Sequence, residues 1–294
     1  MYKIITFLKL IRIQNLIILF VTQYLFHLFV YNNFGDVKLY LLLIITFLIT
    51  ASGYIINDIF DVESDVINKH EVIIGNHIPA RVAIFWYYCF NIIAFLLSCY
   101  LFFSHRNFNC DLILFLIILS SIFILRWYSK VYKHRFIIGN FIIAMLTSLS
   151  VFNVLLLECP EFSYLSQFNF NIQFIVFAFL LTLAREIVKD LEDIDGDKIM
   201  GSRNIASSLS LAQTKCIIIF ILIIVMIILI LWSFFWIHEK IVIIHNIIIN
   251  LMILFSIYKV LFSQNKKDFT YISTLLKIIM ILGVLFIPIS YLSI

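Results

Sequence analysis

Residues 40–65 read YLLLIITFLITASGYIINDIFDVESD, in which an uncharged run is followed at once by a dense acidic segment. The first seventeen residues, Tyr40–Ile56, contain no charged side chain. The next nine residues, Asn57–Asp65, contain four carboxylates. Charged residues are scarce elsewhere in this chain, so their concentration at the end of a hydrophobic segment indicates a functional site.

The composition places this segment in a membrane protein. The 294 residues are 63% hydrophobic and 13% charged, whereas soluble domains are about 45–50% apolar and about 25% charged. The longest hydrophobic run, Cys216–Ile237, has Ser233 as its only polar side chain. As a helix, these residues extend roughly 33 Å, which is enough to cross a hydrocarbon core of about 30 Å. The sequence therefore predicts an all-α, polytopic membrane protein.

Hydropathy divides the chain into nine expected transmembrane helices. They lie at about residues 14–32, 39–56, 80–103, 111–126, 136–157, 170–188, 216–237, 241–262 and 270–292. No shift in composition marks a soluble domain, so we expect one membrane domain over residues 1–294. The basic N-terminal segment precedes an apolar stretch without a small-residue cleavage site, and we expect it to remain as part of the first helix.

The basic residues predict the orientation of these helices. If the N-terminus faces the cytoplasm, seventeen lysines and arginines fall on the inner side. Three fall on the outer side, Lys38, Arg106 and Lys240, and Lys277 lies within the last span. Because inner loops of membrane proteins are enriched in positive charge, we expect a cytoplasmic N-terminus and, with nine spans, a C-terminus outside.

Neither the cysteines nor the histidines form a recognisable ligand pattern. The five cysteines show no CxxC spacing, and we expect them to act as apolar packing residues. The seven histidines include no HExxH pattern, so the sequence predicts no zinc site.

The acidic segment has a counterpart later in the chain, after the sixth expected span. Residues 185–197 read REIVKDLEDIDGD. Both segments contain the skeleton D-x2-D-x3-D, separated by 132 residues: Asp58, Asp61 and Asp65, and Asp190, Asp193 and Asp197. On a helix, positions i, i+3 and i+7 fall within about 60° of arc, so each trio is expected to share one face.

Carboxylates crowded in this way beside a low-dielectric membrane repel each other, so a cation is expected to neutralise them. Mg²⁺ prefers hard oxygen ligands and commonly bridges a few carboxylates to substrate phosphates. A solvated acidic cap on two helix ends is the alternative interpretation, which the repetition on one side of the membrane disfavours. Basic residues lie near both segments: Arg185, Lys189, Arg203, and the loop Arg126–Arg135, in which Lys130 and Arg135 are also ordinary membrane anchors. Together these groups predict a receptor for a diphosphate with a lipid tail.

These residues resemble the UbiA superfamily of intramembrane prenyltransferases. The first signature of that family, N-D-x-x-D-x-x-x-D, is matched by Asn57, Asp58, Asp61 and Asp65, and the second, D-x-x-x-D, by Asp193 and Asp197. The resemblance extends over the whole chain. Weaker matches are Arg12 and Asn15 before the first span, Tyr128 and Lys133 in the loop after the fourth, and Gly139 and Asn140 beyond it.

The resemblance implies nine helices around a central cavity with a cytoplasmic polar cap, and two Mg²⁺ ions. The implied metal ligands are Asn57, Asp61, Asp65, Asp190, Asp193 and Asp197. The implied substrate-binding residues are Arg12, Asn15, Arg81, Lys133, Arg185 and Lys189, and the implied catalytic residues are Asp58, Tyr128 and Lys133. The implied partners are a prenyl diphosphate donor, a lipophilic acceptor and the lipid bilayer, with no nucleic acid and no obligate protein partner.

Within the superfamily, REIVKDLEDIDGDK is most similar to the branch that makes digeranylgeranylglyceryl phosphate. An aromatic prenyltransferase of menaquinone or ubiquinone synthesis is the alternative enzyme, and a cation transporter or a scaffold is the alternative from another class. Transport sites usually lie at mid-membrane depth, whereas these carboxylates lie at span ends. One departure is His70, which replaces the proline usual after Asn68-Lys69, and the basic residue expected next is missing.

Overall fold

The computed structural model describes residues 2–31, 36–104, 108–158, 165–235 and 239–292. Regular structure in these ranges is helical, apart from an isolated bridge between Ile74 and Ile78. The helices form two compact units. Unit 1 comprises Met1–Lys133 and Leu149–Glu161, and unit 2 comprises His134–Ser148 and Phe162–Ile294.

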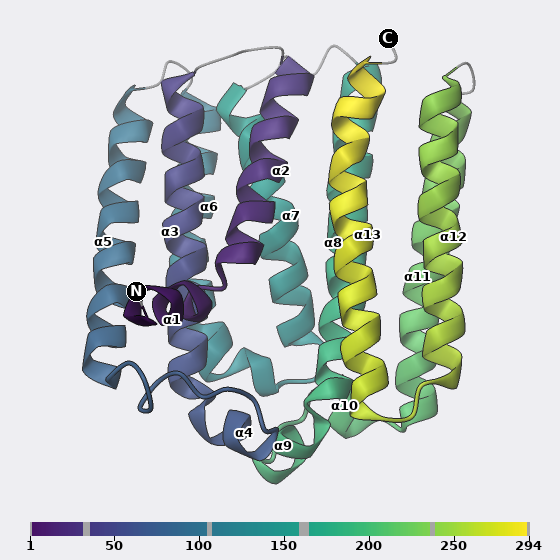
Figure 1. The fold of residues 1–294 in the computed structure, drawn as a ribbon. Coiled ribbons are helices and arrows are strands. Elements are labelled where there is room, and N and C mark those ends of the chain that lie inside the picture. Colours follow the sequence, from purple (N-terminus) through teal and green to yellow (C-terminus); the bar gives the residue numbers. More distant parts are fainter. Residues whose placement is uncertain (1, 32–35, 105–107, 159–164, 236–238, 293–294) are drawn as a thin grey trace. The chain divides into compact units, whose positions relative to one another are not determined.

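Unit 1 is built from helices in the first half of the chain (Figure 1). Its elements are α1 (Tyr2–Leu10), α2 (Ile13–Tyr31), α3 (Val37–Phe60), α4 (Val62–Ile67), α5 (Ala80–Ser104) and α6 (Phe108–Lys130). A short 3-10 helix, η1 (Tyr132–His134), follows α6, and α7 (Ile138–Glu158) contributes its second half to this unit. Unit 2 contains α8 (Leu165–Glu192), α9 (Ile194–Ile199), α10 (Ile205–Ser208), α11 (Leu211–Phe235), α12 (Lys240–Phe262) and α13 (Lys266–Leu292).

Helix α3 is the centre of unit 1 and packs against α2, α5 and α6. Its buried face includes the small residues Ala51, Ser52 and Gly53, which allow neighbouring helices to approach closely. A Cβ atom at Gly53 would lie 3.0 Å from Cδ1 of Leu125 on α6. The Ser52 hydroxyl lies 3.0 Å from Oδ1 of Asn91 on α5, so a polar contact joins the two apolar helices.

The loop after α4 closes the end of unit 1 that holds the first acidic segment. Ile73, Ile74 and Ile78 in this loop belong to one hydrophobic cluster with residues of α1, α3 and α5. On the surface, Lys9 of α1 forms an ion pair of 2.9 Å with Glu71. Apolar burial therefore anchors the loop and holds α4 against the end of α3.

Within the described ranges, seven helices are long and apolar enough to cross a membrane: α3, α5, α6, α7, α11, α12 and α13. An eighth span arises if α1 and α2, which are bent by 62° at their junction, count as one. The polytopic helical architecture is thus as predicted, but the count of nine is not confirmed. Helix α8 covers the expected span 170–188 and carries Arg185, Glu186 and Lys189 near its end, so it is less apolar than the other spans.

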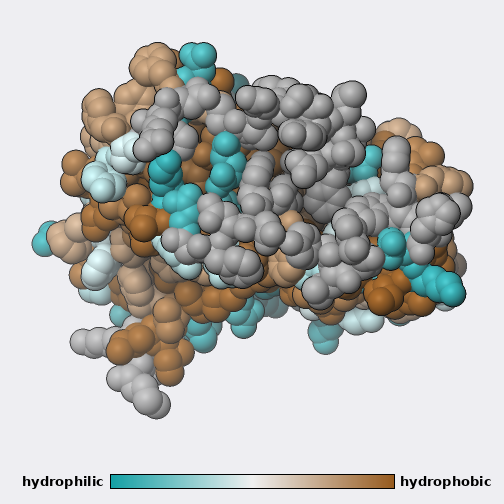
Figure 2. Space-filling view, turned by 90° about the horizontal axis from the view of Figure 1, so that it is seen from above, coloured by the Kyte–Doolittle hydropathy of each residue, from teal (hydrophilic) through white to brown (hydrophobic). Residues whose placement is uncertain are grey.

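Figure 2 views the molecule from the end that carries the C-terminus. Hydrophobic side chains occupy much of the visible surface, and hydrophilic ones gather in small groups among them. One expectation about this chain is wrong: Cys110, in the first turn of α6, is disulfide-bonded, whereas Cys89, Cys99 and Cys216 are free thiols. Arg106 and Cys159 lie outside the described residues.

Candidate active site

The two acidic segments form the same backbone motif, one in each unit. In unit 1, α3 ends at Phe60, Asp61 interrupts the helix at φ −90° and ψ 0°, and α4 begins at the next residue. In unit 2, α8 ends at Glu192, Asp193 interrupts it at φ −101° and ψ 9°, and α9 follows. Each short helix has six residues. The sequence repeat is therefore also a structural repeat of helix, hinge and short helix.

Backbone hydrogen bonds close both copies of this motif in the same way. Each copy ends in a left-handed residue, Lys69 at φ 58° and Gly201 at φ 69°. The amide of the following residue then donates to the carbonyl of the third aspartate: His70 to Asp65 at 2.9 Å, and Ser202 to Asp197 at 2.8 Å. Glycine adopts this conformation without a Cβ penalty, and lysine does not.

Asp61 lies at the centre of the first segment. It is 4% exposed, and its Oδ2 atom accepts hydrogen bonds from Nδ2 of Asn57 and from Nζ of Lys133. Lys133 reaches it from η1, which follows α6. The structure thus brings together three residues that the sequence implicated, and a buried carboxylate already holds one positive charge.

Asp58 pairs with Arg12, which occupies the bend between α1 and α2. The Arg12 Nη2 atom donates to Oδ1 of Asp58 at 2.9 Å, and the guanidinium carbon lies 4.9 Å from the centre of the Tyr54 ring. Asn15 donates to the Tyr54 hydroxyl at 3.3 Å. The expected substrate contacts Arg12 and Asn15 are therefore positioned by α3. Sequence reasoning missed Tyr54, although its place one helical turn before Asp58 was a usable signal.

Asp65, on α4, is the residue of the first segment whose pKa is raised to about 6. Burial, followed by the charges of Asp61 and Asp58, raises the pKa of Asp65 to about 6. The charge of Lys133 lowers it in part. Part of this rise in pKa comes from the two neighbouring carboxylates, and a bound cation would offset their charge.

Amide side chains orient the aspartates of the second segment. Asn140, on α7, donates to Oδ2 of Asp190 at 2.8 Å, and both residues belong to unit 2. Asn204 donates to Oδ2 of Asp197 at 2.6 Å, while its own Oδ1 atom caps α10 by accepting from the amide of Ser207. Asn204 was not expected from the sequence. An asparagine before a short helix is an ordinary cap, and only the fold brings it to Asp197.

Glu186 is a second residue that sequence reasoning missed. Its Oε1 atom lies 2.6 Å from Nζ of Lys189 and 3.3 Å from Nη1 of Arg185. One carboxylate therefore pairs with both expected substrate-binding cations of α8. The i, i+3 spacing of Glu186 and Lys189 was a sequence signal that could have predicted their pairing. The remaining expected residues are Arg81, exposed in the first turn of α5, and Tyr128, half-buried near the end of α6.

The oxygen-rich donor set of both segments is suited to Mg²⁺. The six implied ligands fall three in each unit. In the described part of the chain, neither trio of aspartates brings three carboxylate oxygens within 4.8 Å of one another. Mg²⁺ usually keeps several waters and binds through one or two carboxylates plus substrate phosphates, so an open trio fits this ion better than a closed cage does.

Comparison with known proteins places the chain in a family. The pattern of the UbiA prenyltransferase family matches residues 17–282. The digeranylgeranylglyceryl phosphate synthase of Methanothermobacter thermautotrophicus is 36% identical over 172 residues, which are 58% of this chain and 55% of that protein. The chain thus aligns with little more than half of that relative.

Solved structures agree in fold. A structure of a digeranylgeranylglyceryl phosphate synthase matches with a TM-score of 0.71 and 27% identity over the whole of both chains. A UbiA homologue from Archaeoglobus fulgidus, bound to DMAPP and Mg²⁺, matches with a TM-score of 0.60 and 15% identity over 96% of this chain and 99% of that one. The family match spans most of both units and includes both acidic segments. The chain therefore belongs to the UbiA prenyltransferase family.

Proposed function

We propose that this protein transfers a long-chain prenyl group from an allylic prenyl diphosphate to geranylgeranylglyceryl phosphate, with Mg²⁺ as cofactor. The observation that carries the proposal is the repeated helix–hinge–helix motif, which presents two trios of aspartates at the ends of apolar helices. Its support in the comparisons is that similar proteins are named for this reaction and that a homologue binds a prenyl diphosphate with Mg²⁺.

Two Mg²⁺ ions would be held by Asn57, Asp61 and Asp65 and by Asp190, Asp193 and Asp197. Bound there, they neutralise the diphosphate and make it a workable leaving group as the C–O bond breaks. The protein residues hold these ligands in place. Asn57 orients the Asp61 carboxylate, and Asn140 and Asn204 orient Asp190 and Asp197.

The basic residues supply positive charge to the phosphates. Lys133 pairs with Asp61 in the resting protein, and its ammonium group would move from Asp61 to pair with a diphosphate oxygen when substrate binds. Asp58 holds Arg12 by a 2.9 Å ion pair and thereby directs the guanidinium, so we assign it a positioning role. Lys189 and Arg185, which pair with Glu186, would also supply positive charge to the phosphates. Tyr128 would donate a hydrogen bond to the phosphates. Exposed Arg81 would reach phosphate only through its long side chain.

A phosphorylated acceptor is favoured by two cations within unit 2. Lys277 lies eleven residues into α13, roughly 17 Å along the helix, and Arg185 lies in the last third of α8. Helices α8 and α13 pack together. Glu186 already pairs with Arg185, but a lysine this far inside a membrane helix is costly and favours an anion nearby, which the phosphate of a glyceryl ether supplies and a flat hydroxybenzoate or naphthoate ring does not.

The proposed orientation places the aspartates on the cytoplasmic side, with the N-terminus inside and the C-terminus outside. The distribution of basic residues supports it. A second support is the disulfide of Cys110, in the first turn of α6, whereas Lys133 and Asp61 lie beyond the other end of that helix. Disulfides persist in oxidising compartments, so the Cys110 end is expected to face away from the cytoplasm.

The decisive experiment is product analysis with purified, lipid-reconstituted protein. It would be incubated with geranylgeranyl diphosphate, Mg²⁺ and a mixture of geranylgeranylglyceryl phosphate, 1,4-dihydroxy-2-naphthoate and 4-hydroxybenzoate. We expect mass spectrometry to detect the doubly prenylated glyceryl phosphate, and EDTA to abolish its formation. A prenylated aromatic product would instead establish the quinone-type reaction, and turnover unaffected by EDTA would contradict the metal site.

A further inference from the structure

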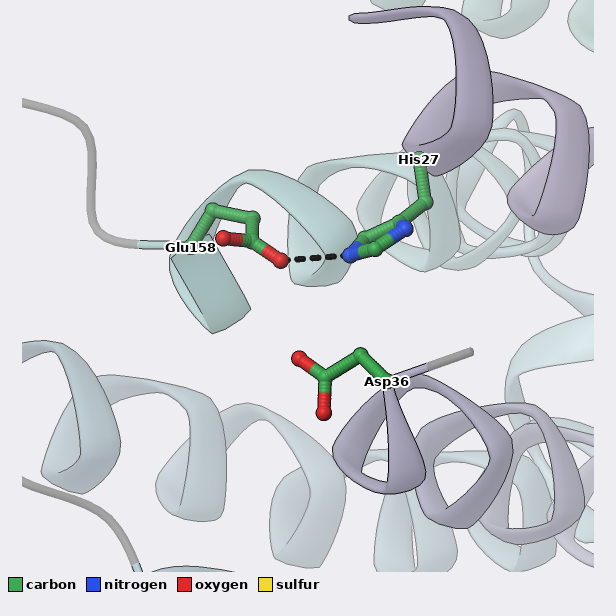
Figure 3. Close-up of side chains that lie close together, drawn as sticks. All are labelled: His27, Asp36 and Glu158. Atoms are coloured by element: carbon green, nitrogen blue, oxygen red, sulfur yellow. Dashed lines mark hydrogen bonds and ion pairs between the residues drawn. The ribbon is translucent and has the colours of Figure 1, made fainter. Parts of the chain in front are cut away.

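A second group of possible metal ligands lies at the other end of unit 1. His27 on α2, Asp36 at the start of α3 and Glu158 at the end of α7 point into one space (Figure 3). One ligand atom from each residue lies within 4.8 Å of those of the other two. Helix α3 has 24 residues and separates Asp36 from Asp61 by roughly 36 Å, so this group is distinct from the acidic segments.

The group is partly buried and held in place by its surroundings. The His27 side chain is 0% exposed and that of Glu158 is 22% exposed. Nε2 of His27 contacts Oε1 of Glu158 directly. The Asp36 side chain is also the N-cap of α3, because its Oδ1 atom accepts a hydrogen bond from the amide of Lys38 at 2.9 Å. This bond holds the carboxylate in place.

One turn before His27, a buried glutamine already joins the same three helices. Nε2 of Gln23 donates to the carbonyl of Ser150 on α7 at 2.7 Å and to the Thr46 hydroxyl on α3 at 3.2 Å. This polar bridge fixes the spacing of α2, α3 and α7 beneath the three ligands. The packing of these three helices therefore helps to pre-organise the site.

We propose that His27, Asp36 and Glu158 bind one divalent transition-metal ion of the zinc class, with water completing the coordination. One imidazole and two carboxylates match the nitrogen and oxygen ligands of Zn²⁺. Tetrahedral ligands at about 2.1 Å from the metal lie roughly 3.4 Å apart. The three ligand atoms already lie within 4.8 Å of one another, and an ion would enter as His27 and Glu158 move slightly apart from their direct contact. The imidazole disfavours Mg²⁺ and Ca²⁺, which take oxygen ligands.

The charge balance supports the same assignment. Two carboxylates lie together at a partly buried position, and a divalent ion would balance their charge. The bound metal would tie together the ends of three helices and stabilise unit 1. No sequence motif predicts the site, because its members are separated by 9 and by 122 residues.

The test is metal retention by the full-length protein in lipid nanodiscs. Protein would be loaded with Zn²⁺, dialysed against excess Mg²⁺ to occupy the oxygen-only sites, and analysed by elemental mass spectrometry. We expect one Zn²⁺ per chain in the unaltered protein. His27→Gln and Glu158→Gln should lose it, whereas the matched control His77→Gln, an exposed histidine of the loop before α5, should retain it.

A more conservative variant separates the loss of metal binding from misfolding. Asn caps helices as well as Asp does, so Asp36→Asn keeps the cap of α3 while removing one charged ligand, and Zn²⁺ affinity should fall roughly tenfold or more. Co²⁺ should give the intense visible absorption of a tetrahedral site in the unaltered protein and not in Asp36→Asn. Retention of no Zn²⁺ by the unaltered protein, or equal retention by all variants, would overturn the proposal and leave a histidine–carboxylate ion pair.

Discussion

Asp61 and Asp193 are equivalent residues of one duplicated motif: each interrupts a membrane helix and begins a six-residue helix, 132 residues apart. Their backbone angles differ by only about ten degrees. In both copies the preceding aspartate lies on the long helix and the following one on the short helix. The motif thus presents three carboxylates along a helix end, where their mutual repulsion favours a bound cation.

Loss of either hinge carboxylate should abolish turnover. Asp61→Asn and Asp193→Asn keep the shape and the hydrogen-bonding capacity of the side chain but remove the charge that binds metal. We expect at least about a hundredfold loss of prenyl transfer, the scale for removing one electrostatic group from a transition state. Diphosphate release measures it. Glu63→Gln and Asp195→Asn, exposed neighbours on α4 and α9, are the controls and should stay active.

Metal binding at the first segment should weaken in mild acid. Because the pKa of Asp65 is raised to about 6, its carboxyl is ionised above that pH and protonated below it, and a proton then competes with Mg²⁺. The apparent affinity should be nearly constant above pH 7 and fall roughly tenfold by pH 5. Mn²⁺ binding followed by electron paramagnetic resonance measures this. A pH profile identical in Asp65→Asn would contradict the assignment.

Lys133 should compete with metal at Asp61. Lys133→Met removes the ammonium and leaves a buried carboxylate without that partner, so the metal-free protein should lose about 1–3 kcal/mol of stability. Mg²⁺ should bind this variant more tightly in the absence of diphosphate and restore its thermal unfolding temperature. Lys130→Met, at the exposed end of α6, is the matched control. Weaker Mg²⁺ binding by Lys133→Met would show that the lysine does not occupy a metal position.

Arg12 and Asp58 should act as one unit. Their 2.9 Å ion pair predicts that Arg12→Ala and Asp58→Ala each raise KM for the prenyl diphosphate, and that the double variant is little worse than either single one. A coupling free energy of about 0.5–3 kcal/mol is expected in the double-mutant cycle. Additive effects would mean that Asp58 has a task of its own, such as contact with metal.

The left-handed residues that end the two motifs provide a test of stability alone. Lys69 and Gly201 occupy the same conformation, and Gly201 has open space around its Cα. Gly201→Ala should therefore cost about 1 kcal/mol through backbone strain, and Lys69→Gly should stabilise the protein by up to about 1 kcal/mol. Thermal unfolding in nanodiscs measures both. Opposite signs at the two positions are the result that the repeated backbone predicts.

The sequence alone determined the class of this protein, the repeat and the carboxylate groups of its candidate site. Long apolar runs specify membrane helices because the hydrophobic effect and backbone hydrogen bonding act locally. The aspartates of each trio lie within one short segment, so their spacing can be read directly from the sequence. Asp58, Asp61 and Asp65 could therefore be chosen before any coordinates were known. The hinge at Asp61 and Asp193 was not predicted, since an i, i+3, i+7 pattern is compatible with an unbroken helix.

Only the tertiary structure decided which side chains meet across helices. Lys133 reaches Asp61 over 72 residues of sequence, Asn140 reaches Asp190 over 50, and His27 reaches Glu158 over 131. Such contacts depend on helix packing, in which small residues such as Gly53 set how closely backbones approach. The periodicity of a sequence predicts which face of a helix a residue lies on. Which residue it contacts on a neighbouring helix depends on how the helices pack.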